Sequence, residues 1–309
     1  MEIHHGIDNF KPIKNAIVTS GTFDGVHIGH RVILKRLIDI ARPTNGQTVV
    51  ITFWPHPRFI LQPENKSLKL LSTFQEKAAI LDEIGVDHLV RITFNRDFSE
   101  LTSEQFIQKV LINAIETHKL VIGYDHRFGR NREGSFEHLA ANHEQYGFRV
   151  EEIPRQDIDH VGVSSTKIRK ALAEGDVPTA TEYLGRQYTI TGIVVRGDQI
   201  GRTIGFPTAN IVVQEEYKLI PADGTYAVKA TYKNAQFQGM LNIGFRPTVN
   251  GKMRRIELHI FDFEGDLYGE YITIHFVQML REEMKFADLN ALKKQLLQDK
   301  HNAQRIFNT

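Results

Sequence analysis

The sequence has 309 residues, which is long enough for two domains that each bury a hydrophobic core. Its 38 basic and 37 acidic side chains argue against a large charged footprint for nucleic acid or membrane lipid and favour small-molecule partners. The lack of cysteine excludes disulfide bonds and thiolate metal sites. With neither a signal-peptide pattern nor an apolar run of about 18 residues, the sequence predicts a cytoplasmic protein.

The first half of the chain alternates short β-prone runs with amphipathic helical runs. Residues 15–20 predict a strand that ends at Gly21, and residues 30–41 carry apolar side chains at helical spacing. Further strands are expected at 48–53, 88–92, 119–122 and 149–153, and further helices at 73–84, 103–115 and 135–146. This alternation predicts an α/β fold with a doubly wound parallel sheet.

The pattern changes after residue 178. Short strands are expected at 188–195, 224–232, 236–243, 256–261 and 271–276. Such a series predicts an antiparallel barrel or sandwich. Residues 286–298 place Leu289, Leu292 and Leu296 on one stripe and predict a helix packed on this β unit. We expect one domain over residues 1–183 and a second over 184–309.

The segment GTFDGVHIGH, which follows the first of these strands, predicts a phosphate site. Gly21, Gly25 and Gly29 let the backbone approach an anion, and the next helix offers free N–H groups. His27 and His30 can donate to charge that builds on an α-phosphorus, work that Mg²⁺ would share. The alternative is a tight turn with two surface histidines, which the strand–turn–helix context disfavours.

Later segments of the first half carry further anion-binding candidates. Ser164, Ser165 and Thr166 precede a helical stretch and can cap it, while Arg169 offers a planar donor fork. The alternative is an ordinary serine cap with a solvated arginine.

Two polar loops follow predicted strands of the sheet. His56 follows one strand, and Asp125 and Arg127 follow another, at the sheet edge where doubly wound folds bind ligands. The alternatives are a rigid loop histidine and a solvated charged loop.

The segment GRTIGFPTAN in the second half predicts a different phosphate cradle, since the sequence lacks GxxxxGK[ST] and the protein-kinase motifs. A flexible loop over phosphates is expected from Gly197, Gly201, Arg202 and Gly205. Thr208 and Asn210 alternate along an extended segment and could hold Mg²⁺ on one side. A simple β-turn is the alternative.

Glu257 is the candidate base for transfer of a phosphate to an alcohol. It shares one face of a predicted strand with His259, while Ile256, Leu258 and Ile260 take the other face. The alternative is a charge on the solvent face of an edge strand.

These segments, in order, resemble the motifs of the bifunctional riboflavin kinase/FAD synthetase family. In the first half they are GTFDGVHIGH, TFWPHP, GYDHRFG and VSSTKIR, and in the second half GFPTAN, NIGFRPT, FDFEGDLYG and LREEMKF. The resemblance covers nearly the whole chain. It implies a Rossmann-like nucleotidylyltransferase domain followed by an antiparallel β-barrel riboflavin kinase domain with a C-terminal helix.

The resemblance implies that Mg²⁺ and ATP serve two steps, phosphorylation of riboflavin to FMN in the second domain and adenylylation of FMN to FAD in the first. It makes Glu257 the catalytic glutamate of the kinase. The ATP site of the first domain would include Gly21, Phe23, Asp24, Gly25, Gly29, His56, Asp125, Ser164, Ser165, Thr166 and Arg169. Flavin contacts would involve Asp262, Asp266 and Arg281. Tyr124 and His126 depart from the family pattern.

Two other functions stay open at this point. One is a nucleotidylyltransferase for another phosphate substrate, such as phosphopantetheine or an alcohol phosphate, fused to an unrelated β domain. The other is a flavin-binding sensor or storage protein, which a turnover assay would distinguish. A nucleic-acid-binding barrel is disfavoured by the balanced charge. The sequence leaves the oligomeric state open.

Overall fold

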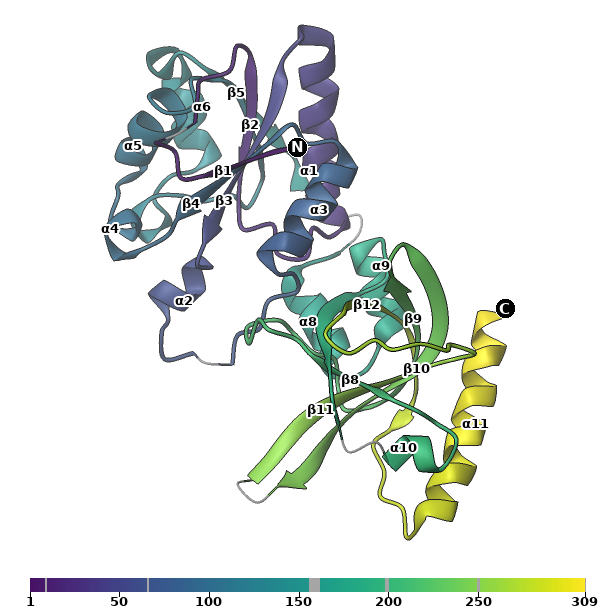
Figure 1. Cartoon of the computed structure of the whole chain (residues 1–309). Helices are drawn as coiled ribbons and strands as arrows, with labels where there is room; N and C mark the ends of the chain where they lie inside the picture. The colour runs from purple at the N-terminus through teal and green to yellow at the C-terminus, as the bar shows by residue number, and fades with distance from the viewer. Residues whose placement is uncertain (9, 66, 156–161, 198–199, 249–250, 309) are drawn as a thin grey trace. The chain divides into compact units, whose positions relative to one another are not determined.

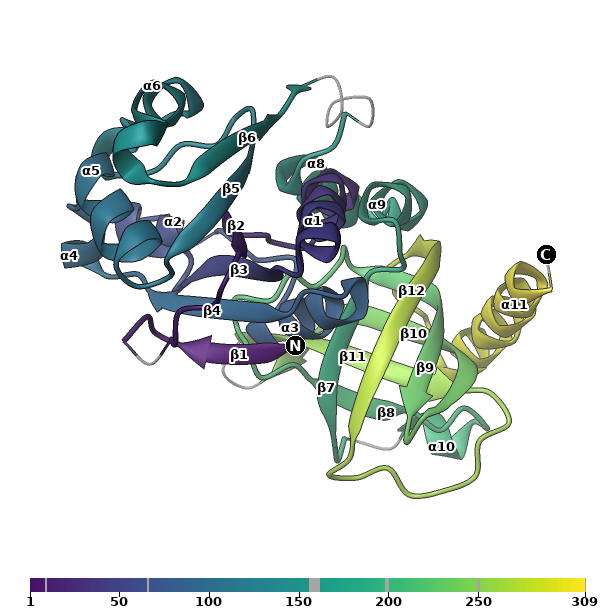
Figure 2. The same cartoon turned by 90° about the horizontal axis from the view of Figure 1, so that it is seen from above.

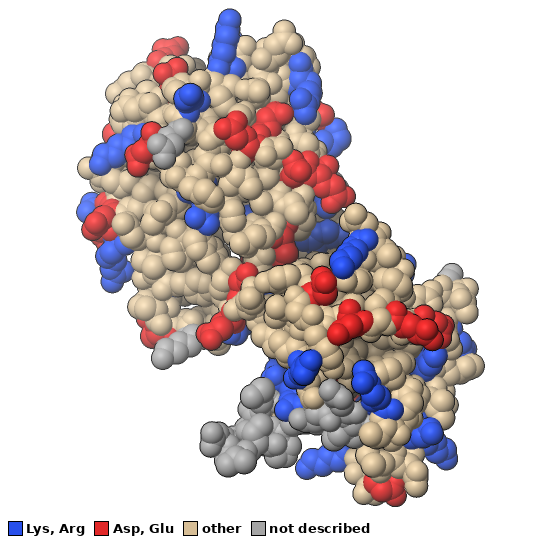
Figure 3. All heavy atoms as spheres, in the orientation of Figure 1, with Lys and Arg blue, Asp and Glu red and all other residues tan. Residues whose placement is uncertain are grey.

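The computed structural model describes residues 1–8, 10–65, 67–155, 162–197, 200–248 and 251–308. The chain forms two compact units, Met1–Ser165 and Thr166–Thr309 (Figure 1). The expected domain boundary between residues 183 and 184 stays a prediction. Among the described residues, no helix combines the length and apolarity needed to cross a membrane. Basic and acidic side chains are interspersed over the face drawn in Figure 3.

A parallel sheet forms the centre of the first unit, as the alternating pattern predicts (Figure 2). Its strand order is β1-β4-β3-β2-β5-β6, and every pairing between neighbours is parallel. The strands are β1 (Glu2–His5), β2 (Ala16–Ser20), β3 (Gln47–Trp54), β4 (His88–Thr93), β5 (Thr117–Gly123) and β6 (Arg149–Ile153). β1 is not among the expected strands, because its run of polar residues lacks an apolar pattern.

Helices cover both faces of this sheet (Figure 1). The α-helices are α1 (Ile28–Ala41), α2 (Pro57–Leu61), α3 (Phe74–Ile84), α4 (Arg96–Ser99), α5 (Ser103–Phe106) and α6 (Phe136–Tyr146). Short 3₁₀ turns lie at η1 (Arg42–Thr44) and η3 (Arg130–Arg132). The single helix expected over 103–115 is instead α5 followed by the π-helical segment η2 (Ile107–Ile112).

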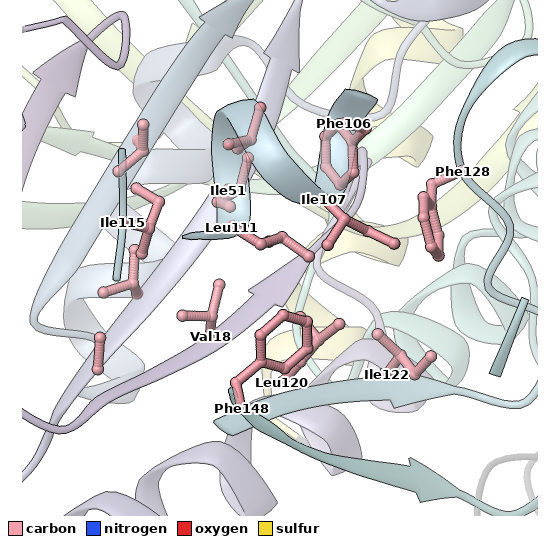
Figure 4. Packing of buried hydrophobic residues seen from close by; sticks show 14 of the residues in the cluster. Val18, Ile51, Phe106, Ile107, Leu111, Ile115, Leu120, Ile122, Phe128 and Phe148 are labelled. Carbon is pink, nitrogen blue, oxygen red and sulfur yellow. The ribbon is translucent and has the colours of Figure 1, made fainter. Parts of the chain in front are cut away.

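The sheet divides the core of the first unit into two layers, since successive side chains of a strand point to opposite faces. On β2, Val18 packs into the layer beneath α5, η2 and α6 (Figure 4), whereas Ile17 packs into the layer with α1 and α3. Leu120 and Val121 of β5 divide in the same way. Burial on both faces explains why consecutive residues at the centre of these strands are apolar, such as Ile17 and Val18 on β2 and Leu120 and Val121 on β5.

A closed antiparallel barrel forms the second unit, which selects the barrel over the sandwich. Its strand order is β10-β11-β8-β7-β12-β9 (Figure 2). The strands are β7 (Thr189–Val195), β8 (Ala209–Val212), β9 (Gly224–Tyr232), β10 (Ala235–Thr248), β11 (Gly251–Ile260) and β12 (Tyr271–Glu282). The helices are α8 (Ser165–Ala173), α9 (Val177–Leu184), α10 (Ile200–Thr203) and α11 (Leu289–Phe307).

The C-terminal helix α11 packs on the barrel. Ala303 is fully buried in a cluster with Phe206 and Met240, and Leu296 packs against the same cluster. Leu289 is exposed, so the predicted stripe holds for only part of its length. The helix begins after the N-cap Asp288, whose carboxylate accepts the backbone N–H of Ala291.

Candidate active sites

The backbone between β2 and α1 is a strained turn. Phe23 and Val26 have φ angles of 45° and 41°, a region that is costly for a β-branched residue such as Val26. Gly25 has a φ of 79°, and the N–H of Gly21 donates to the carbonyl of Ile51 on β3 at 3.0 Å. Strain of this kind is typical of a functional turn, and here it places His27 at the N-cap of α1.

The two histidines of this turn are in direct contact. Nδ1 of His27 accepts the backbone N–H of His30 at 3.3 Å, and the two rings stack with centroids 3.6 Å apart. Because Nδ1 of His27 is an acceptor, its neutral ring carries the proton on Nε2 and can donate there. Burial lowers the pKa of His30 well below its usual value, and nearby His27 and Lys77 add to the effect. A bound anion would oppose this shift.

A lysine that sequence reasoning missed lies beside the turn. Lys77 of α3 is buried, and its ammonium group donates to the carbonyl of Thr22 at 2.6 Å and to Oγ1 of Thr52 at 3.2 Å. Burial lowers its pKa to about 8, although Asp24 opposes the shift. No motif marks this residue, because it reads as an ordinary charged position on an amphipathic helix.

The carboxylate of Asp24 anchors the turn from behind. It accepts the backbone N–H groups of Leu71 at 2.9 Å and Ser72 at 3.2 Å. Oγ of Ser72 accepts the N–H of Gly25 at 3.1 Å, and Oγ of Ser165 donates to the carbonyl of Asp24 at 3.0 Å. The structure thus brings Ser165 to the histidine turn. Its predicted ATP contact, and that of Asp24, stay predictions.

Other candidates of the first site lie at the carboxyl ends of the strands or on α8. His56 follows β3 and caps α2, where its Nδ1 accepts the N–H of Arg58 at 3.2 Å. Asp125 follows β5 and is exposed. Thr166 and Arg169 lie on α8, within the second unit, and Ser164 directly precedes that helix. Their approach to the histidine turn stays a prediction.

His126, which departs from the family pattern, occupies the same edge of the sheet. Its Nε2 lies 3.2 Å from Oγ of Ser20, the last residue of β2. Burial lowers the pKa of His126 to about 4, with smaller contributions from Arg132 and Arg127. His126 is therefore a neutral hydrogen-bonding group at physiological pH.

In the second unit a row of polar side chains runs from strand to strand along the wall of the barrel. On β8 and β11, Asn210 and Glu257 are direct cross-strand partners, and Glu257 in turn faces Asn242 on β10. Asn242 faces Thr225 on β9, which faces Arg281 on β12. Cross-strand partners project to the same side of a sheet, so the five groups share one face. Oγ1 of Thr225 donates to Oδ1 of Asn242 at 2.9 Å.

All five residues of this polar row line a pocket with a volume of about 230 Å³. Thr208 and Gly201 line it too, together with apolar side chains such as Phe206 and Leu296. β11 pairs with β10 on one side and β8 on the other, so Glu257 is not on an edge strand. The register of the barrel therefore joins candidates that lie far apart in the sequence, and sequence reasoning missed Thr225 and Asn242.

The other candidates of the second unit lie outside the pocket lining. Arg202 and Gly205 are exposed, whereas Gly197 packs so closely on Asn210 that a Cβ atom would clash with its amide. Asp262 pairs with Lys300 at 3.7 Å, and the carboxylate of Asp266 accepts the N–H of Tyr268. The loop around Gly197 includes residues 198–199, which lie outside the described residues. The predicted flavin and ATP contacts of these groups stay predictions.

His259 and Arg281 make contacts that hold the pocket in shape. Nδ1 of His259 donates to the carbonyl of Pro207 at 2.8 Å, which fixes the backbone directly before Thr208. Arg281 binds the carboxylate of Asp299 on α11 through Nε at 3.0 Å and Nη2 at 2.9 Å. Asp299 is only 1% exposed, so this ion pair is shielded from water. It connects the polar row to the C-terminal helix.

The pocket also contains Glu283, which sequence reasoning missed. Burial raises the pKa of its carboxyl group, and the nearby charge of Glu257 acts in the same direction, whereas a hydrogen bond with Asn242 opposes it.

Comparison with known proteins identifies the family. Residues 10–167 match the family model described as FAD synthetase, and residues 184–307 match that described as riboflavin kinase. The bifunctional riboflavin kinase/FMN adenylyltransferases of Haemophilus influenzae and Escherichia coli are each 37% identical, covering 100% and 99% of this chain and 100% and 98% of those proteins. The Listeria monocytogenes protein of that name is 38% identical over 99% of this chain and 97% of its own length.

The fold matches a solved structure over nearly its whole length. A crystal structure described as a macrolide-efflux protein from Streptococcus pneumoniae superposes with a TM-score of 0.89 and 30% identity, covering 98% of this chain and 99% of that one. With both family models matched in order and full-length relatives above 30% identity, the chain belongs to the bifunctional riboflavin kinase/FMN adenylyltransferase family, enzymes of flavin-cofactor biosynthesis.

Proposed function

We propose that the barrel pocket phosphorylates riboflavin to FMN and that the histidine turn adenylylates FMN to FAD. The observation that carries the proposal is the polar row, which sets Glu257 beside Asn210 on one face of a pocket with apolar walls. A carboxylate next to neutral oxygen ligands suits phosphate transfer to an alcohol, because one group can accept a proton while the others help hold a metal–phosphate complex.

In the kinase step, Glu257 accepts the proton of the riboflavin hydroxyl as its oxygen attacks the terminal phosphorus of ATP. The bond to the bridging oxygen breaks and ADP leaves. Kinases and adenylyltransferases in general use ATP with a divalent metal, and we propose Mg²⁺ here. The hydroxyl of Thr208 and the amide oxygen of Asn210 fit its preference for oxygen ligands. Mg²⁺ would neutralise charge on the transferred phosphate.

The walls of the pocket suit a planar ring system. Phe206, Met240, Leu241 and Phe286 supply apolar surface, which stabilises a buried aromatic ligand through the hydrophobic effect and stacking. Arg281 adds a positive charge at one end of the polar row, although Asp299 compensates part of it.

In the adenylyl step, a phosphate oxygen of FMN attacks the α-phosphorus of ATP, and pyrophosphate leaves. No protein nucleophile is required, so the enzyme aligns the substrates and stabilises charge. Nε2–H of His27 and the N-terminal end of α1 are the proposed donors. A cytoplasmic location stays a prediction, supported by the cysteine-free composition.

The experiment is turnover with separated products. Riboflavin with Mg²⁺ and ATP should yield FMN and then FAD by chromatography. Glu257→Gln should lose FMN formation, while FAD formation from supplied FMN continues. Glu182→Gln, at an exposed position on α9 outside the pocket lining and the motifs, is the matched control and should keep both activities. FMN formation at the normal rate by Glu257→Gln would contradict the assignment of the base.

A further inference from the structure

Three potential metal ligands converge at the edge of the parallel sheet, away from the histidine turn. β1 is the edge strand and pairs with β4, with Glu2 opposite His88 (Figure 2). Because side chains alternate along a strand, His4 projects to the same face as Glu2. His5, the next residue along β1, projects to the opposite face, where its ring approaches that of Phe74. The fold therefore brings Glu2, His4 and His88 together.

The donor atoms are close enough to share one ion. Nε2 of His4 lies 3.1 Å from Nδ1 of His88, and each of these nitrogen atoms is 3.8 Å from a carboxylate oxygen of Glu2. A tetrahedral Zn²⁺ ion, with bonds of about 2.0–2.1 Å, separates its ligand atoms by about 3.3 Å. The two nitrogen atoms are close to this spacing. The 3.8 Å distances join them to different oxygen atoms of Glu2, so this exposed carboxylate has to turn and move closer to bind the same ion.

The surroundings favour an ordered pair of imidazoles. His88 is buried, and the ring of the buried Phe10 packs edge-on against both His4, at 4.8 Å, and His88, at 6.1 Å. Packing of this kind fixes the orientation of the two rings before an ion arrives, which reduces the entropy lost on binding. Only the exposed carboxylate of Glu2 has to be ordered when the ion binds.

We propose that Glu2, His4 and His88 form a binding site for a first-row transition-metal ion such as Zn²⁺. Two imidazoles and one carboxylate suit Zn²⁺, Co²⁺ or Ni²⁺, whereas Mg²⁺ prefers oxygen ligands and is a poor fit. Three protein ligands leave a fourth position for water. The ion connects β1 to β4, so its structural effect is to stabilise the edge strand. This site is independent of the proposed flavin reactions.

The test is Co²⁺ binding to the full-length protein without nucleotide or flavin. Tetrahedral Co²⁺ absorbs strongly in the visible range, and the cysteine-free chain offers no competing thiolate. We expect one Co²⁺ per chain, displaced by Zn²⁺ but not by millimolar Mg²⁺. Zn²⁺ should also raise the Tm, and a chelator should reverse this rise.

The matched variants replace two neighbouring histidines, His4 and His5, which project to opposite faces of β1. His4→Gln should weaken Zn²⁺ binding by at least about 100-fold and abolish the Co²⁺ spectrum, since loss of a ligand exceeds the effect of losing a supporting hydrogen bond. His5→Gln should bind as the native protein does, and Glu2→Gln should weaken binding without disturbing the core. An unchanged Co²⁺ spectrum in His4→Gln, or equal losses in His4→Gln and His5→Gln, would overturn the proposal.

Discussion

His27 and His30 act as one unit, because their rings stack at 3.6 Å and the backbone of His30 bonds to the ring of His27. Two imidazolium charges at this distance would repel each other, so the pair favours at most one proton. Substitution of either ring also removes the support of the other.

We therefore expect the losses in activity caused by substituting the two histidines to be non-additive. His27→Gln and His30→Gln should each lower kcat/KM for FAD formation by about 10²–10³-fold, the range for loss of a charge-stabilising donor. The double variant should lose little more than either single one. His118→Gln, at an exposed position on β5, is the control. Additive losses in the cycle would show that the two rings work separately.

Substitution of Lys77 should lower the activity of the first site with little effect on the stability of the fold. Burial of Lys77 lowers its pKa to about 8, so holding its charge costs folding free energy at neutral pH. In Lys77→Met, relief of this cost offsets the lost hydrogen bonds to Thr22 and Thr52, and the Tm should change by only a few degrees. FAD formation should nevertheless fall about tenfold or more, because the turn loses a fixed positive charge.

The control for this change is Lys35→Met, since Lys35 lies on the exposed face of α1, where it pairs with Asp39 at 2.6 Å. It should keep both activities. A Lys77→Met protein that is fully active would make Lys77 a packing residue alone.

Breaking the ion pair between Arg281 and Asp299 should destabilise the barrel strongly. Removal of one member of a buried pair leaves an uncompensated charge, which typically costs about 3–5 kcal/mol. Asp299→Asn should lower the denaturant midpoint of the barrel and raise the KM for riboflavin, because Arg281 also lines the pocket. The exposed pair of Asp262 with Lys300 gives the contrast, and Asp262→Asn should change stability by less than about 1 kcal/mol.

His126 should make the first unit sensitive to acid. Its pKa is about 4 in the folded protein against 6.5 in the unfolded chain, so the unfolded state binds more protons between these values. The stability contribution is complete above pH 6.5 and is lost as the pH falls towards 4. After allowance for partial exposure, the loss is on the order of 2 kcal/mol.

The measurement is the pH dependence of unfolding free energy for the native protein and His126→Gln. The variant should show a flatter profile between pH 6.5 and 4, whereas His118→Gln should follow the native curve. Parallel curves for all three proteins would contradict the pKa shift of His126.

Local patterns predicted most of the helices and strands, because they depend on side chains a few positions apart. The expected strand 224–232 coincides with β9, and the helix 73–84 with α3 and its N-cap Thr73. β8 was expected only as an extended segment around Thr208 and Asn210, since a strand of four residues is too short for a periodic signal. α9 was missed because Pro178 suggested a break, whereas proline is well suited to the first turn of a helix.

The candidate sites show the same division. The histidine turn is contiguous in sequence and was found directly, and Glu257 was found from alternation along one strand. Asn242 begins the NIGFRPT motif, but its role beside Glu257, like that of Thr225, could not be predicted, because it depends on barrel register, which no short window contains. Lys77 reaches its partners through packing of α3 on the sheet, which is equally non-local.

The position of the polar row on strands rather than loops limits how this enzyme can change during evolution. Inserting or deleting one residue in β10 or β11 would turn every following side chain to the opposite face. A change in β11 before Glu257 would turn Glu257 into the apolar interior that holds Tyr226, and an aliphatic neighbour such as Leu258 would take its place in the pocket. Length variation should therefore concentrate in the connections between strands rather than in β11, which carries Glu257.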